Sequence, residues 1–147
     1  MVGITPETGR TRIAARLSSA GLSEARSPLG VRNESAPRID RSFAVLPKSA
    51  DPSGGRGRDR HRIRMAYIIE LCHKLTPSSG QASPDVALRD YATAVRYVLQ
   101  PGTDVTGPAS IDLGSATFAY AGGGAYLITT FDCTLAFDFP LDLAGAG

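Results

Sequence analysis

Two long stretches of the chain alternate between apolar and other residues, as in β-strands with one buried face. The first runs from His61 to Leu75 and the second from Ala125 to Phe139. The opposite face of the second stretch is polar, with Thr130 and Asp132 among its residues. The apolar positions are Ile63, Met65, Tyr67, Ile69 and Leu71 in the first stretch and Leu127, Phe131, Cys133, Leu135, Phe137 and Phe139 in the second.

These two predicted strands are unusually long. Fifteen residues span roughly 50 Å at about 3.3 Å per residue, whereas typical strands have about 5–6 residues. A domain of this size has a radius of gyration of only about 15 Å, so we expect the strands to extend beyond their own core. Because unpaired strand edges attract other chains, this length predicts assembly with a partner rather than catalysis.

Two helices are also predicted. The first begins at Thr5-Pro6-Glu7, which supplies a capping hydroxyl, a proline and an acidic residue in the order that favours a helix start. It ends near Gly21, a residue type common just after a helix. The second begins at Ser83-Pro84-Asp85 by the same rule, and Pro101-Gly102 ends it. Its apolar stripe consists of Leu88, Tyr91, Ala92, Val95, Val98 and Leu99.

Two shorter strands complete the pattern, at Arg38–Leu46 and Ile111–Tyr120. Pro47 either ends the first or marks it as an edge strand. A linker over residues 22–37 precedes it, and a mobile Arg/Gly-rich hairpin loop over residues 48–60 follows it.

The predicted order is therefore α-β-β-α-β-β, within a single domain covering residues 1–147. The expected fold class is α+β. In it, two long β-hairpins form one antiparallel sheet, and two helices pack on one of its faces.

Charge is distributed unevenly between the two halves of the chain. The net charge is +2, but residues 1–64 hold 13 Lys/Arg against 6 Asp/Glu, whereas residues 65–147 hold 3 against 8. Head-to-tail contact between copies, or contact with an acidic partner, would use this asymmetry; a solvated basic surface is the simpler interpretation. We expect a soluble protein, because the N-terminus has no apolar leader and the uncharged stretch 113–131 reads as a hairpin.

Signatures of catalysis and metal binding are weak. Nucleotide-binding and hydrolase motifs are missing from the sequence. Cys72 and His73 are adjacent, so a strand would point them to opposite faces and prevent them from holding one metal ion. Asp132 and Asp138 lie about 20 Å apart along one strand, too far for a catalytic pair. Cys133 shares the apolar face and is expected to be a buried free thiol. No metal and no cofactor is expected.

An arginine cluster is the one candidate functional site. If the first long strand extends back through the loop, the five side chains line one face of a β-arm about 6.6 Å apart, where they would contact phosphates or carboxylates. A solvated, flexible arm is the competing interpretation. The residues are Arg56, Arg58, Arg60, Arg62 and Arg64.

The order of elements resembles that of the tail-terminator, or tail-completion, proteins of long-tailed bacteriophages. The stretches Arg41–Val45 and Tyr67–Leu71 look like the paired strands of that family, and Ser83-Pro84-Asp85 opens the helix that follows. The resemblance covers most of residues 4–141 and rests on pattern and element order rather than on specific motifs.

The resemblance implies a structural role in the virion, at the neck of the tail, after assembly in the host cytoplasm. Such proteins form a ring, usually a hexamer, at the head-proximal end of the tail tube. The ring ends tube polymerisation and joins the tail to the head connector, and DNA passes through its lumen without sequence-specific binding. Neither catalysis, a cofactor nor a membrane is involved.

Three other functions are considered. Another neck or connector protein at the same junction would share most of these features. A basic nucleic-acid-binding module would use the arginine face and bind DNA in a strongly salt-dependent manner. A small enzyme with its site in a loop would be marked by a perturbed His61 or Cys72.

Overall fold

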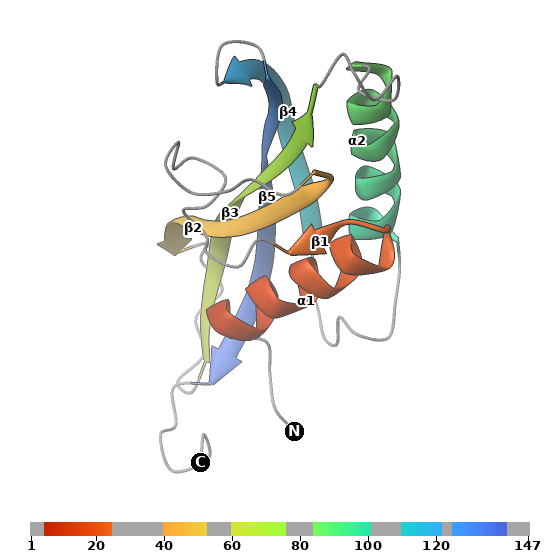
Figure 1. Ribbon diagram of the computed structural model, residues 1–147. Helices are drawn as coiled ribbons and strands as arrows, with labels where there is room; N and C mark the ends of the chain where they lie inside the picture. The colour runs from red at the N-terminus through yellow and green to blue at the C-terminus, as the bar shows by residue number, and fades with distance from the viewer. Residues whose placement is uncertain are drawn as a thin grey trace.

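The computed structural model describes residues 5–24, 40–52, 60–75, 84–100, 110–121 and 125–140, with the side chains at positions 60, 61 and 138–140 left aside. Two helices and five strands follow one another along the chain (Figure 1). They are α1 (Pro6–Ser19), β1 (Ser23–Glu24), β2 (Ser42–Pro52), β3 (Arg60–Lys74), α2 (Pro84–Leu99), β4 (Ser110–Ala121) and β5 (Tyr126–Pro140).

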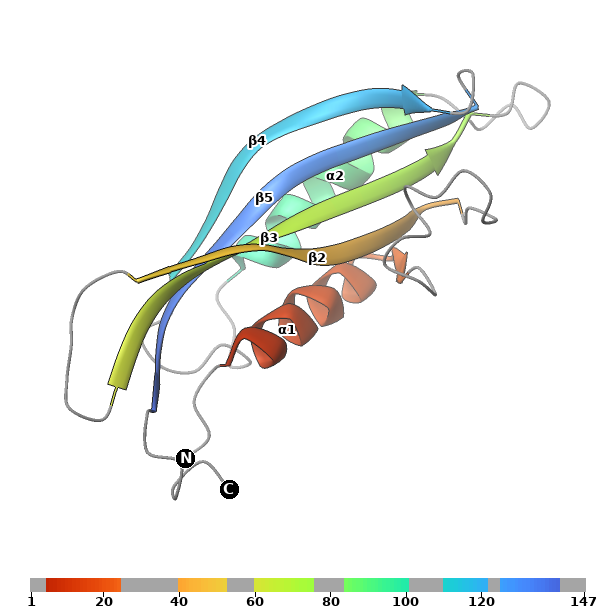
Figure 2. The same ribbon diagram turned by 90° about the vertical axis from the view of Figure 1, so that its left-hand side faces the viewer.

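The strands form one sheet in the order β1-β2-β3-β5-β4, with both helices on the same face (Figure 2). The α+β class is confirmed, but the predicted order α-β-β-α-β-β is wrong because β1 adds a strand. β1 pairs parallel to β2, whereas all other pairs are antiparallel, so the sheet is mixed. A two-residue strand has no periodicity that a sequence pattern can reveal.

The start of β1 follows from the way α1 ends. Thr5 caps the helix, since its side chain accepts a hydrogen bond from the Thr8 backbone N–H, as the sequence predicted. At the other end Gly21 has a φ of +94°, the left-handed conformation that glycine adopts easily. This turn buries Leu22 and directs Ser23 alongside Ser42 of β2.

The first hairpin is longer than expected, because β2 continues through Pro47 to Pro52. The pairing with β3 shifts register between Pro47 and Ser49, and such a bulge lets a strand continue past an irregular position. Residues 48–52 and 60, predicted to lie in the loop, therefore belong to strands. The remaining loop positions, 53–59, lie outside the described residues, as do the predicted cap Ser83 and the linker from residue 25 to 39.

The core follows the long strands along almost their whole length, so the prediction that they extend beyond it is wrong for residues 63–71 of β3. Ile63, near the start of β3, and Phe137, near the end of β5, are both buried in the main cluster. The reason is that the helices cover successive parts of the strands. α1 approaches Tyr67 and Leu135 through Gly9, whereas α2 lies over Phe131 farther along.

Candidate functional site

The arginine face of β3 is the first candidate site. Arg62 and Arg64 share the sheet face opposite the helices, since the residues between and after them, Ile63 and Met65, are buried in the core. Arg64 is exposed and Arg62 is half-buried. The structure thus brings these two arginines to one face, as predicted. Arg56 and Arg58 lie outside the described residues, and Arg60 is described only as the first residue of β3.

Carboxylates on the neighbouring strands oppose both arginines. Asp51 of β2 is the cross-strand partner of Arg64, and Asp138 of β5 is the partner of Arg62. Opposite charges at directly facing positions attract each other. The arm is therefore a mixed-charge surface rather than the purely basic stripe that the sequence suggested, which favours a protein partner with charges of both signs.

The sheet face opposite the helices is closed at one end and open at the other. At the closed end Ala44 and Cys72 are buried, with Tyr126 and Ile128 packed against them, and the Glu70 carboxylate is buried there too. Toward the open end, Lys48 forms an ion pair with Asp132, and both side chains are well exposed. The open end therefore presents polar side chains and short apolar ones without a covering helix.

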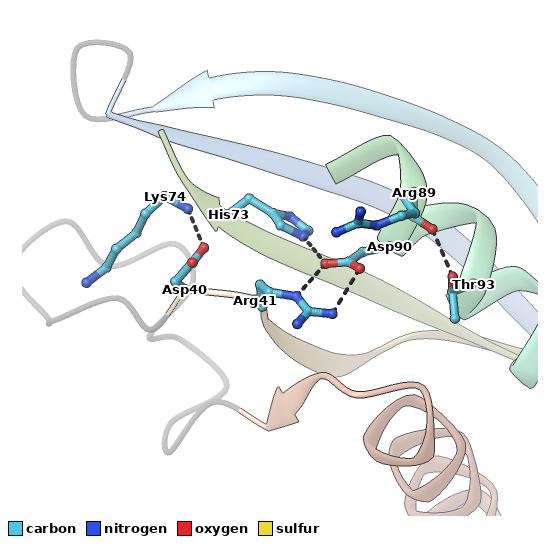
Figure 3. Close-up of polar contacts among 7 residues, drawn as sticks. All are labelled: Asp40, Arg41, His73, Lys74, Arg89, Asp90 and Thr93. Atoms are coloured by element: carbon cyan, nitrogen blue, oxygen red, sulfur yellow. Dashed lines mark hydrogen bonds and ion pairs between the residues drawn. The ribbon is translucent and has the colours of Figure 1, made fainter. Parts of the chain in front are cut away.

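A buried polar cluster joins α2 to the sheet (Figure 3). Asp90, on the inner face of α2, accepts hydrogen bonds from Arg41 Nε at 2.8 Å and Arg41 Nη2 at 3.0 Å. His73 Nε2, from the end of β3, lies 2.8 Å from Asp90 Oδ2. Three elements distant in sequence therefore converge on one carboxylate.

Asp90 is ionised in this cluster. Burial alone would raise the pKa of Asp90, but the hydrogen bonds from Arg41 and His73 outweigh it and hold the pKa below its ordinary value. Because a carboxylate only accepts hydrogen bonds, His73 Nε2 must carry the proton. His73 Nδ1 is buried without a hydrogen-bond partner among the described residues.

This cluster is an anchor rather than a catalytic site. A histidine oriented by an aspartate is also the geometry of a general base. Here, however, His73 is only 2% exposed and Asp90 only 5%, so no substrate reaches the imidazole in this conformation. Arg41 adopts a φ of +54°, which is uncommon for a non-glycine residue. The bidentate contact with Asp90 compensates for this backbone conformation.

Two further contacts fix the ends of the helical layer. The Lys74 backbone N–H donates a hydrogen bond to Asp40 Oδ1 at 2.9 Å (Figure 3). Arg16 of α1 donates to the carbonyl oxygens of Val98 at 2.7 Å and Gln100 at 2.6 Å, at the C-terminal end of α2. A cation there satisfies carbonyl groups that the helix itself leaves unpaired.

The two cysteines are both buried free thiols, which confirms the prediction for Cys133. Burial raises the pKa of Cys133 to about 12, so it is not a thiolate at neutral pH. Cys72 and His73 lie on opposite faces of β3, as predicted, with Cys72 in the small cluster and His73 against α2. Within the described residues, no group of three or more His, Cys, Asp or Glu side chains is arranged to hold a metal ion.

Sequence reasoning missed Asp90, although one signal was available. Ala87, Ala94 and Val98 form the buried stripe of α2, and Asp90 falls within that stripe. A charged residue on the buried face of a helix requires a partner. The sequence therefore contained the reason to look for one, but not the identity of Arg41 or His73.

Comparison with known proteins adds no family. No model of a protein family matches the chain, and no curated protein is significantly similar to it in sequence. Among the described residues, neither helix has the length and apolarity needed to cross a membrane.

Proposed function

We propose that this protein is a structural virion subunit that forms a ring at the head-proximal end of a phage tail tube. The ring would end tube polymerisation and join the tail to the head connector. One observation carries the proposal: the sheet is covered by helices on one face only, and its edge strand β4 is twelve residues long with exposed aromatic side chains. Surfaces of this kind are normally covered by another chain.

The pairing of the strands is consistent with the resemblance that suggested this function. The stretches Arg41–Val45 and Tyr67–Leu71 were expected to pair, and Phe43 indeed faces Leu71 while Val45 faces Ile69. Pro84 opens α2 after this hairpin, at the expected place. This agreement concerns the fold; the role in the virion is inferred.

The proposal names four partners. The protein binds itself in a homo-oligomeric ring, most simply a hexamer, and it binds the tail tube protein on one side and the head connector protein on the other. DNA passes through the lumen without sequence-specific contacts. Neither an enzymatic step nor a cofactor forms part of this function, and the protein resides in the tail or neck of the virion.

A second candidate function rests on Arg62 and Arg64. Their shared face would suit a basic nucleic-acid-binding module, although Asp51 and Asp138 oppose them in register. A protein interface is better supported, because arginine and aspartate in alternation repel a uniformly negative backbone less selectively than they attract a mixed surface. Another neck protein at the same junction would also use such an interface.

The test is the mass of the purified protein by light scattering on a sizing column, alone and with tail tubes, followed by negative-stain imaging. Six copies of the 15.4 kDa chain give about 92 kDa. A closed ring with a central hole, free or on the tube end, supports the proposal. A protein that stays monomeric with tubes present contradicts it.

A double substitution of Arg62→Glu and Arg64→Glu separates the two functions. If the ring still forms but no longer docks to tube or connector, the arm is a protein-binding surface. If the protein binds DNA with a log–log salt slope of about −0.9 for each phosphate contacted, and the substitution removes this binding, the nucleic-acid module is the correct function. Substitution of the exposed Thr11→Glu on α1 controls for added negative charge.

A further inference from the structure

One flank of α2 is apolar but exposed. Leu88, Ala92, Val95 and Leu99 recur at intervals of four, three and four residues, which places them along one side of the helix. This side is not the one that packs on the sheet, which carries Ala87, Ala94 and Val98. Leu88 is 48% exposed and Leu99 is 45% exposed.

The edge strand β4 continues this apolar flank. Phe118 and Tyr120 pair with Thr129 and Leu127 on the helix side of the sheet, yet they are 41% and 63% exposed. Tyr91 of α2 joins the two elements, because its ring meets Phe118 edge-on at 5.8 Å and Phe131 of the core at 5.2 Å. We call the surface made by Leu88, Val95, Leu99, Phe118 and Tyr120 the α2–β4 seam.

The two edges of the sheet differ in their protection. Within the described residues β4 pairs only with β5, and no charged residue or proline occurs from Leu113 to Ala121. The opposite edge strand, β2, carries Pro47 and Lys48 beside a register shift and ends at Pro52. Charges, prolines and bulges are the devices that keep an edge strand from pairing. By this criterion β2 is protected and β4, apart from its own shift near Gly114, is not.

The distribution of charge identifies what covers the seam. The strand order puts β1 and β2, from the half of the sequence with excess Lys/Arg, at one edge. It puts β4 and β5, from the half with excess Asp/Glu, at the other edge. The sole charged residue of β4 is Asp112. Two copies side by side in the same orientation therefore bring a basic edge against an acidic one, whereas two β4 edges facing each other do not.

We propose that the α2–β4 seam is the docking surface for the next copy of this chain, which covers it with the edge formed by α1, β1 and β2. The contact is head to tail, because the two surfaces differ, and repetition of such a contact closes a ring when the rotation allows it. This inference rests on the proposed ring function and specifies its subunit interface. The aromatic pair supplies the kind of side chain that dominates protein interfaces.

The first experiment replaces Leu88→Lys and Tyr120→Lys together and measures assembly by light scattering over a range of protein concentrations. We expect the concentration for half-maximal ring formation to rise about tenfold or more, since each lysine would be buried against the neighbour. The matched control is Tyr97→Lys, because Tyr97 is an exposed aromatic residue on α2, 37% exposed, outside the seam. The control should assemble like the unmodified protein, and melting curves monitor the fold of both variants.

A second variant, Asp112→Arg, keeps the test decisive if the lysine variant fails to fold, since Asp112 is exposed on β4. It should also weaken ring formation, by placing a cation against the basic edge of the neighbour. Rings that form normally in both folded variants overturn the seam interface but leave the ring function intact. An unmodified protein that forms no ring, even with tubes, overturns both. A two-fold dimer that the seam variants abolish overturns the head-to-tail arrangement in particular.

Discussion

At the scale of single residues, Gly9 determines how closely α1 approaches the sheet. A Cβ atom at this position would lie 2.7 Å from Tyr67 Oη and 3.0 Å from Leu135 Cδ1, well inside normal contact. Tyr67 cannot easily move aside, because it is 1% exposed and its hydroxyl donates a hydrogen bond to the Pro6 carbonyl. The missing side chain of Gly9 is therefore a packing requirement, although glycine weakens a helix interior.

Replacing Gly9→Ala should destabilise the protein despite the better helix propensity of alanine. Overpacking of this kind costs about 1–3 kcal/mol, against a gain of at most about 1 kcal/mol from propensity. Urea denaturation monitored by circular dichroism measures the difference. Thr11→Ala on the exposed side of the same helix is the control, and a Gly9→Ala variant more stable than the parent would show that α1 moves away freely.

Replacing Asp90→Asn tests the buried anchor through its dependence on pH. The folded pKa of Asp90 lies below the ordinary value of 3.8. Its ionisation therefore stabilises the fold at pH above that value, and this contribution is lost as the pH falls through the folded pKa. We expect the variant to lose about 2–3 kcal/mol of unfolding free energy at pH 7 and the gap from the parent to narrow at pH 3.

The control for this prediction is Asp112→Asn, which removes an exposed carboxylate from β4 and should change stability by less than about 0.5 kcal/mol. Denaturation curves at pH 7 and pH 3 on the same samples provide the comparison. A gap between parent and Asp90→Asn that is equally large at both values would assign the loss to packing rather than to the charge.

At the scale of elements, α2 is held at two places. Asp90 fixes its middle to β2 and β3, and Arg16 of α1 binds the carbonyl groups at its C-terminal end. The helix lies on the sheet through small residues, Ala87 and Ala94, which bring it close but bury little apolar area. The polar anchors therefore determine where α2 sits, and with it the position of the exposed flank that we propose as an interface.

Replacing Arg16→Leu should loosen the last turn of α2 without unfolding the protein. The variant loses the hydrogen bonds to the Val98 and Gln100 carbonyl groups, with an expected cost of about 1–2 kcal/mol. Hydrogen exchange should become faster for the backbone amides of the C-terminal turn and remain unchanged near Asp90. Arg96→Leu, an exposed position on the same helix, should leave both regions unchanged; similar effects of the two variants would argue against the capping role.

At the scale of the whole molecule, the sheet order turns a difference along the sequence into a difference between edges. The two halves of the chain carry excess charge of opposite sign, and the sheet places strands of each half at its two edges. A ring built by head-to-tail contacts brings these edges together at every interface, so electrostatic attraction would be repeated around the ring.

Assembly should therefore weaken as sodium chloride is raised from about 0.05 to 0.5 M, because the Debye length shortens to a few ångströms over this range. We expect the sizing-column mass to shift from ring to smaller species at a fixed, limiting protein concentration. The apolar seam should keep some assembly at high salt. A ring whose stability does not respond to salt would mean that the apolar contact alone holds the subunits together.

The residues themselves determined the local elements, since alternation and capping are properties of neighbouring positions. The long strands, the start of α1 at Thr5-Pro6 and its end at Gly21 follow from short-range sterics and hydrogen bonds. Only the tertiary structure decided the rest, because it depends on contacts between distant segments. It added β1 through the parallel pairing of Ser23 with Ser42, covered the long strands with two helices in succession, and brought Arg41 and His73 to Asp90.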